Sequence, residues 1–251
     1  MSRIWLTGAS SGIGAELAAV LLGQGHHLAL SARQIGPLQA LAERYPNQVL
    51  VLPGDLSDPA QVSCIIQRID VEWAALDQVI LNAGTCEYLE PGQFDTRLVE
   101  RVLDTNLLGT CHCLEAVLPL LRRGQAPHLV AVCSAVTWLA LPRAGAYGAS
   151  KAALRYLLES LRIDLAAEGI DVTLVSPGFV DTPLTRRNDF PMPQIWSAQR
   201  AAQHIARRLG ARPLDIAFPW AFIFVMRLLG HLPARWRLAL GRRLSRNAER
   251  T

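Results

Sequence analysis

Tyr147 and Lys151 are the residues whose types and spacing point most directly to chemistry. They stand four apart where an apolar helical pattern begins, and that pattern comprises Leu154, Leu157, Leu158, Leu161 and Leu165. Positions i and i+4 share one helix face, so a phenol and an ammonium are expected side by side. A free tyrosine has a pKa near ~10, and a neighbouring cation lowers it toward the range of efficient proton transfer. The pair therefore predicts a general acid–base site.

Lys151 is the single lysine of a chain that uses arginine at 24 positions, and this exception suggests a chemical reason for an ammonium. A compact ammonium fits against a phenol and donates to a ribose hydroxyl, whereas a guanidinium is a fixed fork. Ser134 precedes Tyr147 by thirteen residues and follows an apolar run. A serine there is often only a turn residue, but beside Tyr147 it is placed to donate to the same carbonyl oxygen.

Alternating strands and helices must position these side chains. Apolar runs predict strands at 3–7, 27–32, 49–52, 78–81, 128–133, 171–175 and 214–218, with helices between them that include 59–73 and 197–209. Small or polar residues follow most of these runs. The pattern predicts an α/β fold, a Rossmann-type doubly wound parallel sheet of about seven strands with helices on both faces and the polar residues at one rim.

A glycine-rich turn joins the first strand to the first helix. A helix N-terminus presents free N–H groups and a positive dipole end to an anion, and glycines let the backbone approach a pyrophosphate. The expected phosphate-binding residues are Gly8, Ser10, Ser11, Gly12, Ile13 and Gly14.

The second strand ends at Ala32 and Arg33, where an acidic residue would hold the adenosine ribose of NAD(H). No carboxylate occurs here, and an arginine accepts a 2′-phosphate, so the sequence favours NADP(H). A loop cation without a ligand is the simpler interpretation of Arg33.

The other strand ends supply further candidates for the cofactor site, because ligands bind beyond the carboxyl ends of strands in such sheets. They are Asp55, Leu56, Asn82, Ala83, Gly84, Pro177, Gly178, Val180 and Thr182. Asn106 lies within an apolar helical pattern, where an amide is costly unless it is hydrogen-bonded. Either a water relay or a structural hydrogen bond accounts for it, and the sequence does not distinguish the two.

In this order and spacing, the motifs resemble those of the classical short-chain dehydrogenase/reductase family over residues 7–182. The resemblance implies reversible hydride transfer between a nicotinamide and a carbonyl/alcohol pair, with no metal. It makes Tyr147 the acid–base, gives Ser134 the substrate oxygen, and lets Lys151 lower the tyrosine pKa while binding the nicotinamide ribose. Asn106 completes a water relay.

The same resemblance implies contacts with the rest of the cofactor. Asp55 meets the adenine, Asn82 supports the cofactor side of the cleft, and Thr182 meets the carboxamide. It also implies homodimers or homotetramers formed through the helices that carry Asn106 and Tyr147.

Composition indicates a well-buried core, since 51% of residues are hydrophobic and 18% charged. Five cysteines without metal-ligand spacing indicate free thiols in a reducing compartment. We expect an intracellular, cytoplasmic protein, since no signal segment is visible and the longest uncharged apolar run, 216–226, is too short to span a bilayer.

Residues 1–218 are expected to form one NAD(P)-binding domain with a mobile substrate flap at 184–210, followed by a helical extension at 219–251. From Arg200 onward the chain has eleven arginines against Asp215 and Glu249. The extension predicts two helices. The second carries a stripe of Leu232, Trp236, Leu240 and Leu244, with Arg235, Arg237, Arg242 and Arg246 flanking it and Arg243 inside it. Peripheral contact with an anionic membrane and packing on another subunit both fit this pattern.

Apolar residues in segments expected near the cleft predict a lipophilic carbonyl or alcohol substrate. They are Trp138, Leu139, Leu141, Phe179, Phe190, Met192 and Trp196. Arg143, Arg186 and Arg187 leave a carboxylate-bearing substrate open. A non-catalytic, cofactor-binding regulatory protein or a membrane-surface protein is the alternative to an enzyme. Nucleic-acid binding is not expected, because the basic segment lacks a recognition motif.

Overall fold

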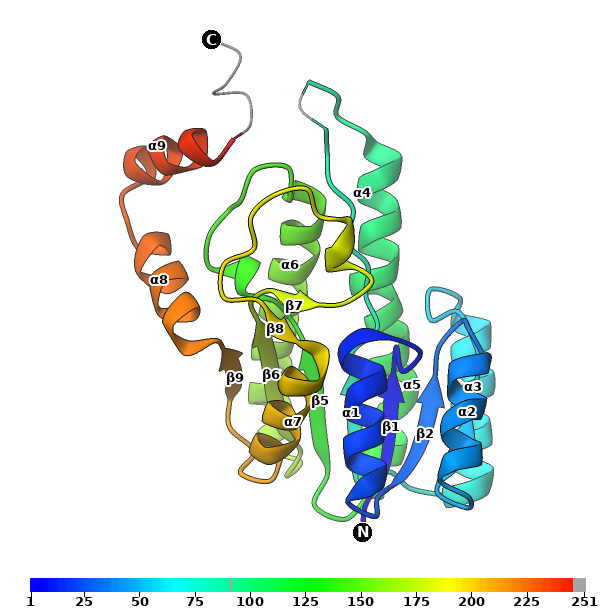
Figure 1. Cartoon of the computed structure of the whole chain (residues 1–251). Coiled ribbons are helices and arrows are strands. Elements are labelled where there is room, and N and C mark those ends of the chain that lie inside the picture. The colour runs from blue at the N-terminus through cyan, green and yellow to red at the C-terminus, as the bar shows by residue number, and fades with distance from the viewer. Residues whose placement is uncertain (91, 246–251) are drawn as a thin grey trace.

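A seven-stranded parallel sheet forms the centre of the computed structural model, which describes residues 1–90 and 92–245 (Figure 1). The strand order is β3-β2-β1-β4-β5-β6-β9. The strands are β1 (Arg3–Thr7), β2 (His27–Ser31), β3 (Val49–Val51), β4 (Gln78–Leu81), β5 (His128–Val132), β6 (Asp171–Pro177) and β9 (Asp215–Phe218). The chain runs outward from β1 to β3 and then returns to β4, so the strand order reverses between β1 and β4. Such a reversal opens a crevice at the carboxyl ends of the strands.

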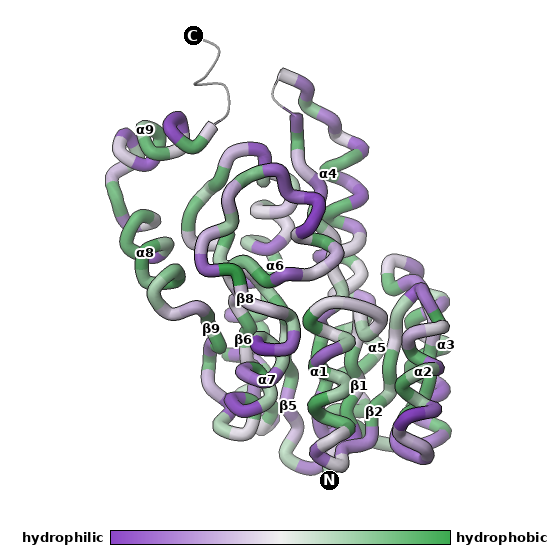
Figure 2. The backbone as a smooth tube through the Cα atoms, viewed as in Figure 1, coloured by the Kyte–Doolittle hydropathy of each residue, from purple (hydrophilic) through white to green (hydrophobic). Residues whose placement is uncertain are grey.

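Helices cover both faces of the sheet (Figures 1 and 2). One face carries α1 (Gly12–Gly23), α2 (Gly36–Arg44) and α7 (Ala198–Leu209). The other carries α3 (Pro59–Trp73), α5 (Gly109–Arg122) and α6 (Gly145–Ala166), and α4 (Thr96–Leu103) packs on α6. Side chains of β1 alternate between the two cores, Ile4 and Leu6 on one side and Trp5 on the other. This period of two is the geometry of a strand buried on both faces.

The predicted α/β fold is confirmed, and the strand ends differ from the expected ones by at most two residues. Helix α2 was missed because its polar sequence buries only Leu38. Also missed was a small parallel sheet of β7 (Val180–Asp181) and β8 (Trp196–Ser197). These strands are too short to leave a period in the sequence.

The expected flap at 184–210 divides into two parts with different packing. Residues 184–197 form an irregular excursion with one short helical turn, η3 (Thr185–Arg187). Helix α7 is different, because Ala201, Ala202 and Ile205 are fully buried against the α1 face of the sheet. Placing residues 198–209 in the flap was therefore wrong: they belong to the core.

The C-terminal extension forms α8 (Trp220–Gly230) and α9 (Ala234–Leu244), which lie to one side of the sheet (Figure 1). Both predicted helices are present, while Arg246 lies outside the described residues. Among the helices that the structure describes, none combines the length and the apolarity that crossing a membrane requires.

Candidate active site

Tyr147 lies in the first turn of α6, beside Ser134 at the end of β5. Burial raises the pKa of the Tyr147 phenol, and a hydrogen bond with the Ser134 side chain acts in the opposite direction without cancelling it. The predicted lowering of the tyrosine pKa is therefore wrong for the chain alone. The physical reason is desolvation, which disfavours the charged phenolate. The neutral phenol is the form from which a proton can be donated.

Lys151 is almost fully buried and points to the ends of β4 and β5. Its Nζ donates to the Val132 carbonyl oxygen at 2.9 Å, and burial lowers the pKa of its ammonium. A Cβ added to Gly84 would lie 3.3 Å from Nζ, so this glycine lets the backbone after β4 pass close to the ammonium. The lysine thus lies on the floor of the crevice, where a ribose hydroxyl could be reached.

Ser134 begins the 3₁₀ turn η2 (Ala135–Thr137) directly after β5. Its Oγ accepts a hydrogen bond from the Val136 N–H at 3.2 Å, and its carbonyl oxygen accepts one from Thr137 Oγ1 at 3.0 Å. Accepting from Val136 leaves the Ser134 proton free to be donated, which is what polarising a carbonyl requires.

Asn106 lies in a π-helical turn, η1 (Asp104–Leu108), between α4 and α5. Its Oδ1 accepts from the Thr85 N–H at 2.7 Å, and its Nδ2 donates to the Thr85 carbonyl and Ser150 Oγ, each at 2.9 Å. The fully buried amide is therefore satisfied within the protein. Of the two alternatives left open by the sequence, the structure shows the structural hydrogen bond for the side chain.

The glycine-rich turn is fitted tightly to the start of the segment after β4. Asn82 Nδ2 donates to the Thr7 and Gly8 carbonyls at 3.1 and 3.2 Å, and Thr7 Oγ1 accepts from the N–H groups of Asn82 and Ala83. Gly8 has φ +67°, a conformation that favours glycine. Ser11, the N-cap of α1, makes no side-chain cap hydrogen bond, so its side chain leaves the first N–H groups of this helix without an acceptor.

At the end of β2, Ala32 and Arg33 lie beside the segment that leads from β3 to α3, since the Gly54 N–H donates to the Ala32 carbonyl oxygen at 3.1 Å. The Arg33 guanidinium is exposed and has no hydrogen-bond or ion-pair partner among the described residues. Its positive charge contributes to lowering the pKa of Asp55. Asp55 Oδ1 accepts from the Ser57 N–H and Oγ at 3.0 and 2.8 Å. These hydrogen bonds hold the pKa of the Asp55 carboxyl below its usual value. One carboxylate oxygen and the arginine fork remain available at this end.

One cleft joins all of these strand ends. Of the cofactor-binding residues predicted from sequence, every one lines it except Gly14. A Cβ at Gly14 would overlap the Gly8 carbonyl oxygen, so its role is close packing of α1 behind the turn. Ser134 and Asn106 are not among its lining residues, but Ser134 hydrogen-bonds Tyr147 and Asn106 lies beside Gly84, both of which line it. Sequence reasoning missed further lining residues, namely Gly54, Ser57, Thr85, Thr105, Val132, Cys133, Pro183, Leu184 and Thr185. Most of them adjoin a predicted residue, which is the signal that was available.

The residues after β6 bring the excursion over the glycine turn. A Cβ added to Gly12 would lie 3.0 Å from Thr182 Cγ2, and Thr182 is held by hydrogen bonds with Thr185. The segment after β6 therefore packs against the glycine turn and forms that side of the cleft.

A series of aromatic side chains adjoins two residues of the cleft, Tyr147 and Gly178, and we call this series the aromatic mouth. The Tyr88 and Phe190 rings meet edge-on at 5.6 Å, and Phe179 lies 6.1 Å from Phe190 and 5.5 Å from Phe222 of α8. Tyr88 lies close enough to Tyr147 for the two phenols to interact electrostatically, and burial raises the Tyr88 pKa. Neither Tyr88 nor Phe222 was singled out from the sequence.

Two of the apolar residues expected at the substrate site have other roles. Trp196 stacks on Phe218 at 4.9 Å in the core on the α7 side, so its assignment to the substrate site was wrong. The Trp138 ring lies under two guanidinium groups, those of Arg155 at 5.2 Å and Arg227 at 4.5 Å. Both rings therefore pack on side chains that lie far from them in the sequence, and the local sequence does not reveal these contacts.

The cations considered for a carboxylate substrate are mostly paired. Arg143 bonds Glu90 and Asp189 and has a side chain only 18% exposed. Arg186 bonds Asp181 at 2.8 Å. Arg143 and Arg186 are therefore already paired with carboxylates of this chain.

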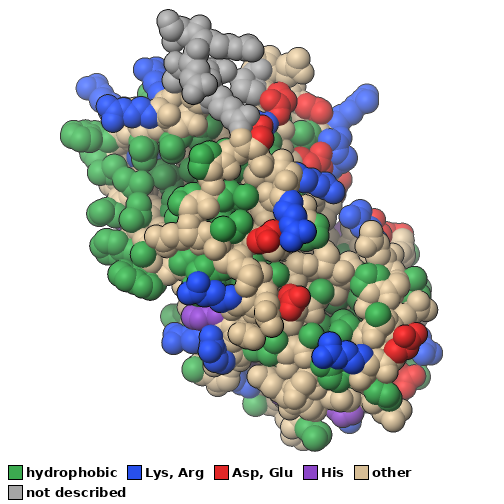
Figure 3. Space-filling model, viewed as in Figure 1, with side chains coloured by type: hydrophobic (Ala, Val, Ile, Leu, Met, Phe, Trp, Pro, Cys, Tyr) green, Lys and Arg blue, Asp and Glu red, His purple; other side chains and the backbone are tan. Residues whose placement is uncertain are grey.

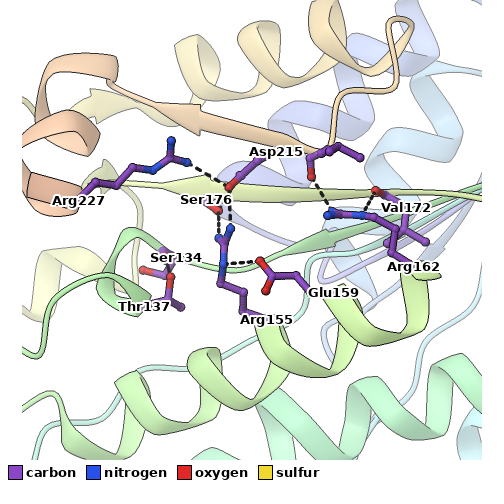
Figure 4. Close-up of polar contacts among 10 residues, drawn as sticks. Ser134, Thr137, Arg155, Glu159, Arg162, Val172, Ser176, Asp215 and Arg227 are labelled. Atoms are coloured by element: carbon purple, nitrogen blue, oxygen red, sulfur yellow. Dashed lines mark hydrogen bonds and ion pairs between the residues drawn. The ribbon is translucent and has the colours of Figure 1, made fainter. Parts of the chain in front are cut away.

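A polar network behind Ser134 ties α6, β6, β9 and α8 together (Figure 4). Arg155 bonds Glu159 at 2.9 Å, Ser176 Oγ at 3.2 Å and Asp215 at 3.0 Å. Arg227 of α8 reaches the same Asp215 carboxylate at 3.4 Å. Two arginines on one half-buried carboxylate fix α8 to the edge of the sheet.

A crevice at the strand-order reversal, lined by a glycine turn, defines a dinucleotide-binding α/β protein. A sequence model of the short chain dehydrogenases matches residues 2–191, and the chain belongs to this family of oxidoreductases. The resemblance found in the sequence is thereby confirmed. An uncharacterized oxidoreductase of Myxococcus xanthus is 35% identical over 243 residues, which cover 95% of this chain and 96% of that protein. The 11-beta-hydroxysteroid dehydrogenase 1A of Arabidopsis thaliana is 35% identical over 193 residues, covering 74% of this chain and 54% of that protein.

Solved structures show the same fold. A short-chain dehydrogenase from Streptomyces avermitilis superposes with a TM-score of 0.83 at 24% identity, covering 99% of this chain and 100% of that chain. A short chain dehydrogenase/reductase from Burkholderia phymatum, in complex with NAD, superposes with a TM-score of 0.82 at 22% identity, covering 90% of this chain and 92% of that chain. An alcohol dehydrogenase from the archaeon Thermococcus sibiricus, complexed with 5-hydroxy-NADP, superposes with a TM-score of 0.78 at 25% identity, covering 87% of this chain and 96% of that chain.

Proposed function

We propose that this protein is an NADP(H)-dependent oxidoreductase that interconverts a lipophilic carbonyl compound and its alcohol. One observation carries the proposal: Tyr147 and Lys151 line the same cleft as the glycine turn, and Ser134 lies directly beside Tyr147. Acid–base groups and a dinucleotide cradle thus meet in one place.

The residues present fit the cofactor. The turn at Gly8 and Gly12 is open to a pyrophosphate, and Gly84 leaves room beside Lys151. When bound, NADP(H) would supply or accept the hydride. Ser134 would donate to the carbonyl oxygen, Tyr147 would give that oxygen its proton, and Lys151 would hold the ribose and stabilise the phenolate left behind.

The preference for NADP(H) rests on Arg33. Its guanidinium is unpaired among the described residues, and it lines the cleft where β2 ends without a carboxylate. A phosphate monoester is the ligand that matches a free guanidinium fork. The relatives of known structure include one complexed with NAD and one with 5-hydroxy-NADP, so the family uses both kinds of cofactor.

The lipophilic substrate is supported by the aromatic mouth formed by Tyr88, Phe179, Phe190 and Phe222, and by the pairing of Arg143 and Arg186 with carboxylates. A named relative is a hydroxysteroid dehydrogenase, which is consistent with a large apolar substrate. We also propose a homodimer or homotetramer through α4, α5 and α6, where Tyr156 and Ile163 are 79% and 76% exposed.

Fluorescence titration of the purified protein with NADPH and NADH tests the cofactor. We expect NADPH to bind more tightly, and Arg33→Ala to weaken NADPH about tenfold or more while leaving NADH nearly unchanged, because a charged hydrogen bond contributes ~1.5–3 kcal/mol. Arg44→Ala, an arginine outside the cleft, is the matched control. Equal affinities for the two nucleotides, unaffected by Arg33→Ala, would remove the NADP(H) preference. Ketones of increasing chain length then test the substrate class, and a lack of preference for longer chains would contradict it.

A further inference from the structure

Helices α8 and α9 carry large apolar side chains that face solvent. Trp220 is 79% exposed and Trp236 is 68% exposed. Five further apolar side chains of these helices are about half exposed, namely Phe224, Val225 and Leu228 on α8 and Leu238 and Leu244 on α9. In the space-filling view, apolar side chains gather over these two helices, and basic side chains border them at the upper edge (Figure 3). We call these seven residues the α8–α9 face.

The charged side chains within this segment have one sign. Residues 219–245 contain five arginines and no aspartate or glutamate. Arg227 is used by Asp215 and Trp138. The guanidinium groups of Arg235, Arg237, Arg242 and Arg243 are exposed, and none forms an ion pair with another described residue. An apolar surface bordered by unpaired arginines matches the interface of an anionic lipid bilayer, where apolar side chains enter the acyl boundary and cations meet headgroups.

Helix α8 is oriented firmly, so its outer face is a defined surface. Ile223 and Met226 are buried beneath it. Arg227 forms an ion pair with Asp215 (Figure 4). Its guanidinium also lies over the Trp138 ring. A Cβ added to Gly230 would overlap the Trp138 carbonyl, so the end of the helix closely approaches the segment that follows Ser134.

The inner side of the same helix reaches the mouth of the cleft. Phe222 contacts Phe179, and a Cβ on Gly178 would lie 2.8 Å from the Phe222 ring. The aromatic series continues through Phe190 to Tyr88, beside Tyr147. One helix therefore has an exposed apolar face outside and a wall of the substrate mouth inside.

We propose that the α8–α9 face docks on the surface of an anionic membrane and holds the substrate mouth beside the lipid. The second part rests on the lipophilic substrate proposed above, whereas the docking itself does not. A second copy of this chain is a poorer occupant, because a two-fold contact through this face would set arginines against arginines. Interspersed basic and aromatic residues suit an anionic bilayer, because the cations contact its headgroups and the aromatic rings lie at its interface.

Flotation of the full chain with vesicles tests the docking. We expect binding to phosphatidylcholine vesicles that contain phosphatidylglycerol, weaker binding in high salt, and little binding to phosphatidylcholine alone. Both Trp220→Ser with Phe224→Ser and Arg235→Glu with Arg237→Glu should reduce binding roughly tenfold or more. Matched controls are Phe94→Ser, which also replaces a 79% exposed ring, and Arg97→Glu on α4.

Two results would overturn the docking proposal. The first is wild-type protein that stays with the soluble fraction, or double variants that float as well as wild type. The second is self-association by sedimentation velocity that the same substitutions abolish, which would assign the face to a second copy. NADPH titration of the same samples separates the proposals, because wild-type protein that binds NADPH but does not float with the vesicles refutes only the membrane surface.

Discussion

Gly14→Ala tests how closely the glycine turn must pack to form a nucleotide site. A Cβ at this position would overlap the Gly8 carbonyl oxygen and lie 2.5 Å from Asn82 Nδ2. An ordinary contact is ~3.5 Å, so α1 must move by about 1 Å relative to β4. That movement breaks the hydrogen bonds from Asn82 to Thr7 and Gly8, which hold the turn in place.

The magnitude follows from two opposing contributions. Overpacking of this size destabilises the fold by ~1–3 kcal/mol. The higher helix propensity of alanine opposes this loss, but near a helix terminus it contributes only part of the ~1 kcal/mol that separates alanine from glycine. The free energy of unfolding should therefore fall by about 2 kcal/mol, which lowers the Tm by about 4–8 °C for a chain of this size. NADPH affinity should fall at least about tenfold, because the displaced N–H groups no longer converge on the phosphates.

Gly23→Ala is the matched control, since it changes the same residue type in the same helix. Nothing lies within 4 Å of a Cβ there, so the variant should keep its NADPH affinity and gain up to ~1 kcal/mol. Thermal unfolding and fluorescence titration measure both effects. Gly14→Ala protein that melts and binds NADPH like wild type would refute the packing argument. A lower Tm with unchanged affinity would refute the link between the turn and nucleotide binding.

Two further variants probe Tyr147 and His128. Tyr147→Phe should lower kcat by about 10²–10⁴-fold with little change in NADPH affinity, since only the proton donor is lost; turnover close to wild type would exclude Tyr147 as the acid. His128 bonds Gln78 and Thr173, and burial lowers its pKa to about 4. Between pH ~6.5 and 4 the imidazole is protonated in the unfolded chain but neutral in the folded chain. The contribution of neutral His128 to the free energy of unfolding is therefore complete above pH ~6.5 and is lost as the pH falls toward 4. Urea unfolding should show a free energy of unfolding about 2 kcal/mol lower at pH 5 than at pH 7.5, and this decrease should be smaller in His128→Gln. An equal decrease in that variant would mean that other groups cause the pH dependence.

The sequence by itself determined the fold and most of the residues that line the cleft. Motifs such as Gly8–Gly14, Asn82 and Ser134 stand at the ends of apolar runs, and parallel strands bring all such ends to one rim. Hence residues up to 170 positions apart were placed together without knowledge of any contact. Their chemical roles remain proposals, since placement in a cleft does not by itself show a reaction.

Tertiary structure alone decided which partner each side chain has. Lys151 was expected to lower the Tyr147 pKa, yet burial raises it, because desolvation depends on everything packed around the phenol. Trp196 was expected near the substrate but stacks on Phe218, which comes from a strand in another part of the chain. The orientation of α8 likewise depends on Arg227 reaching Asp215 of β9. Local patterns specify elements and their ends, whereas burial and pairing arise only when distant segments pack together.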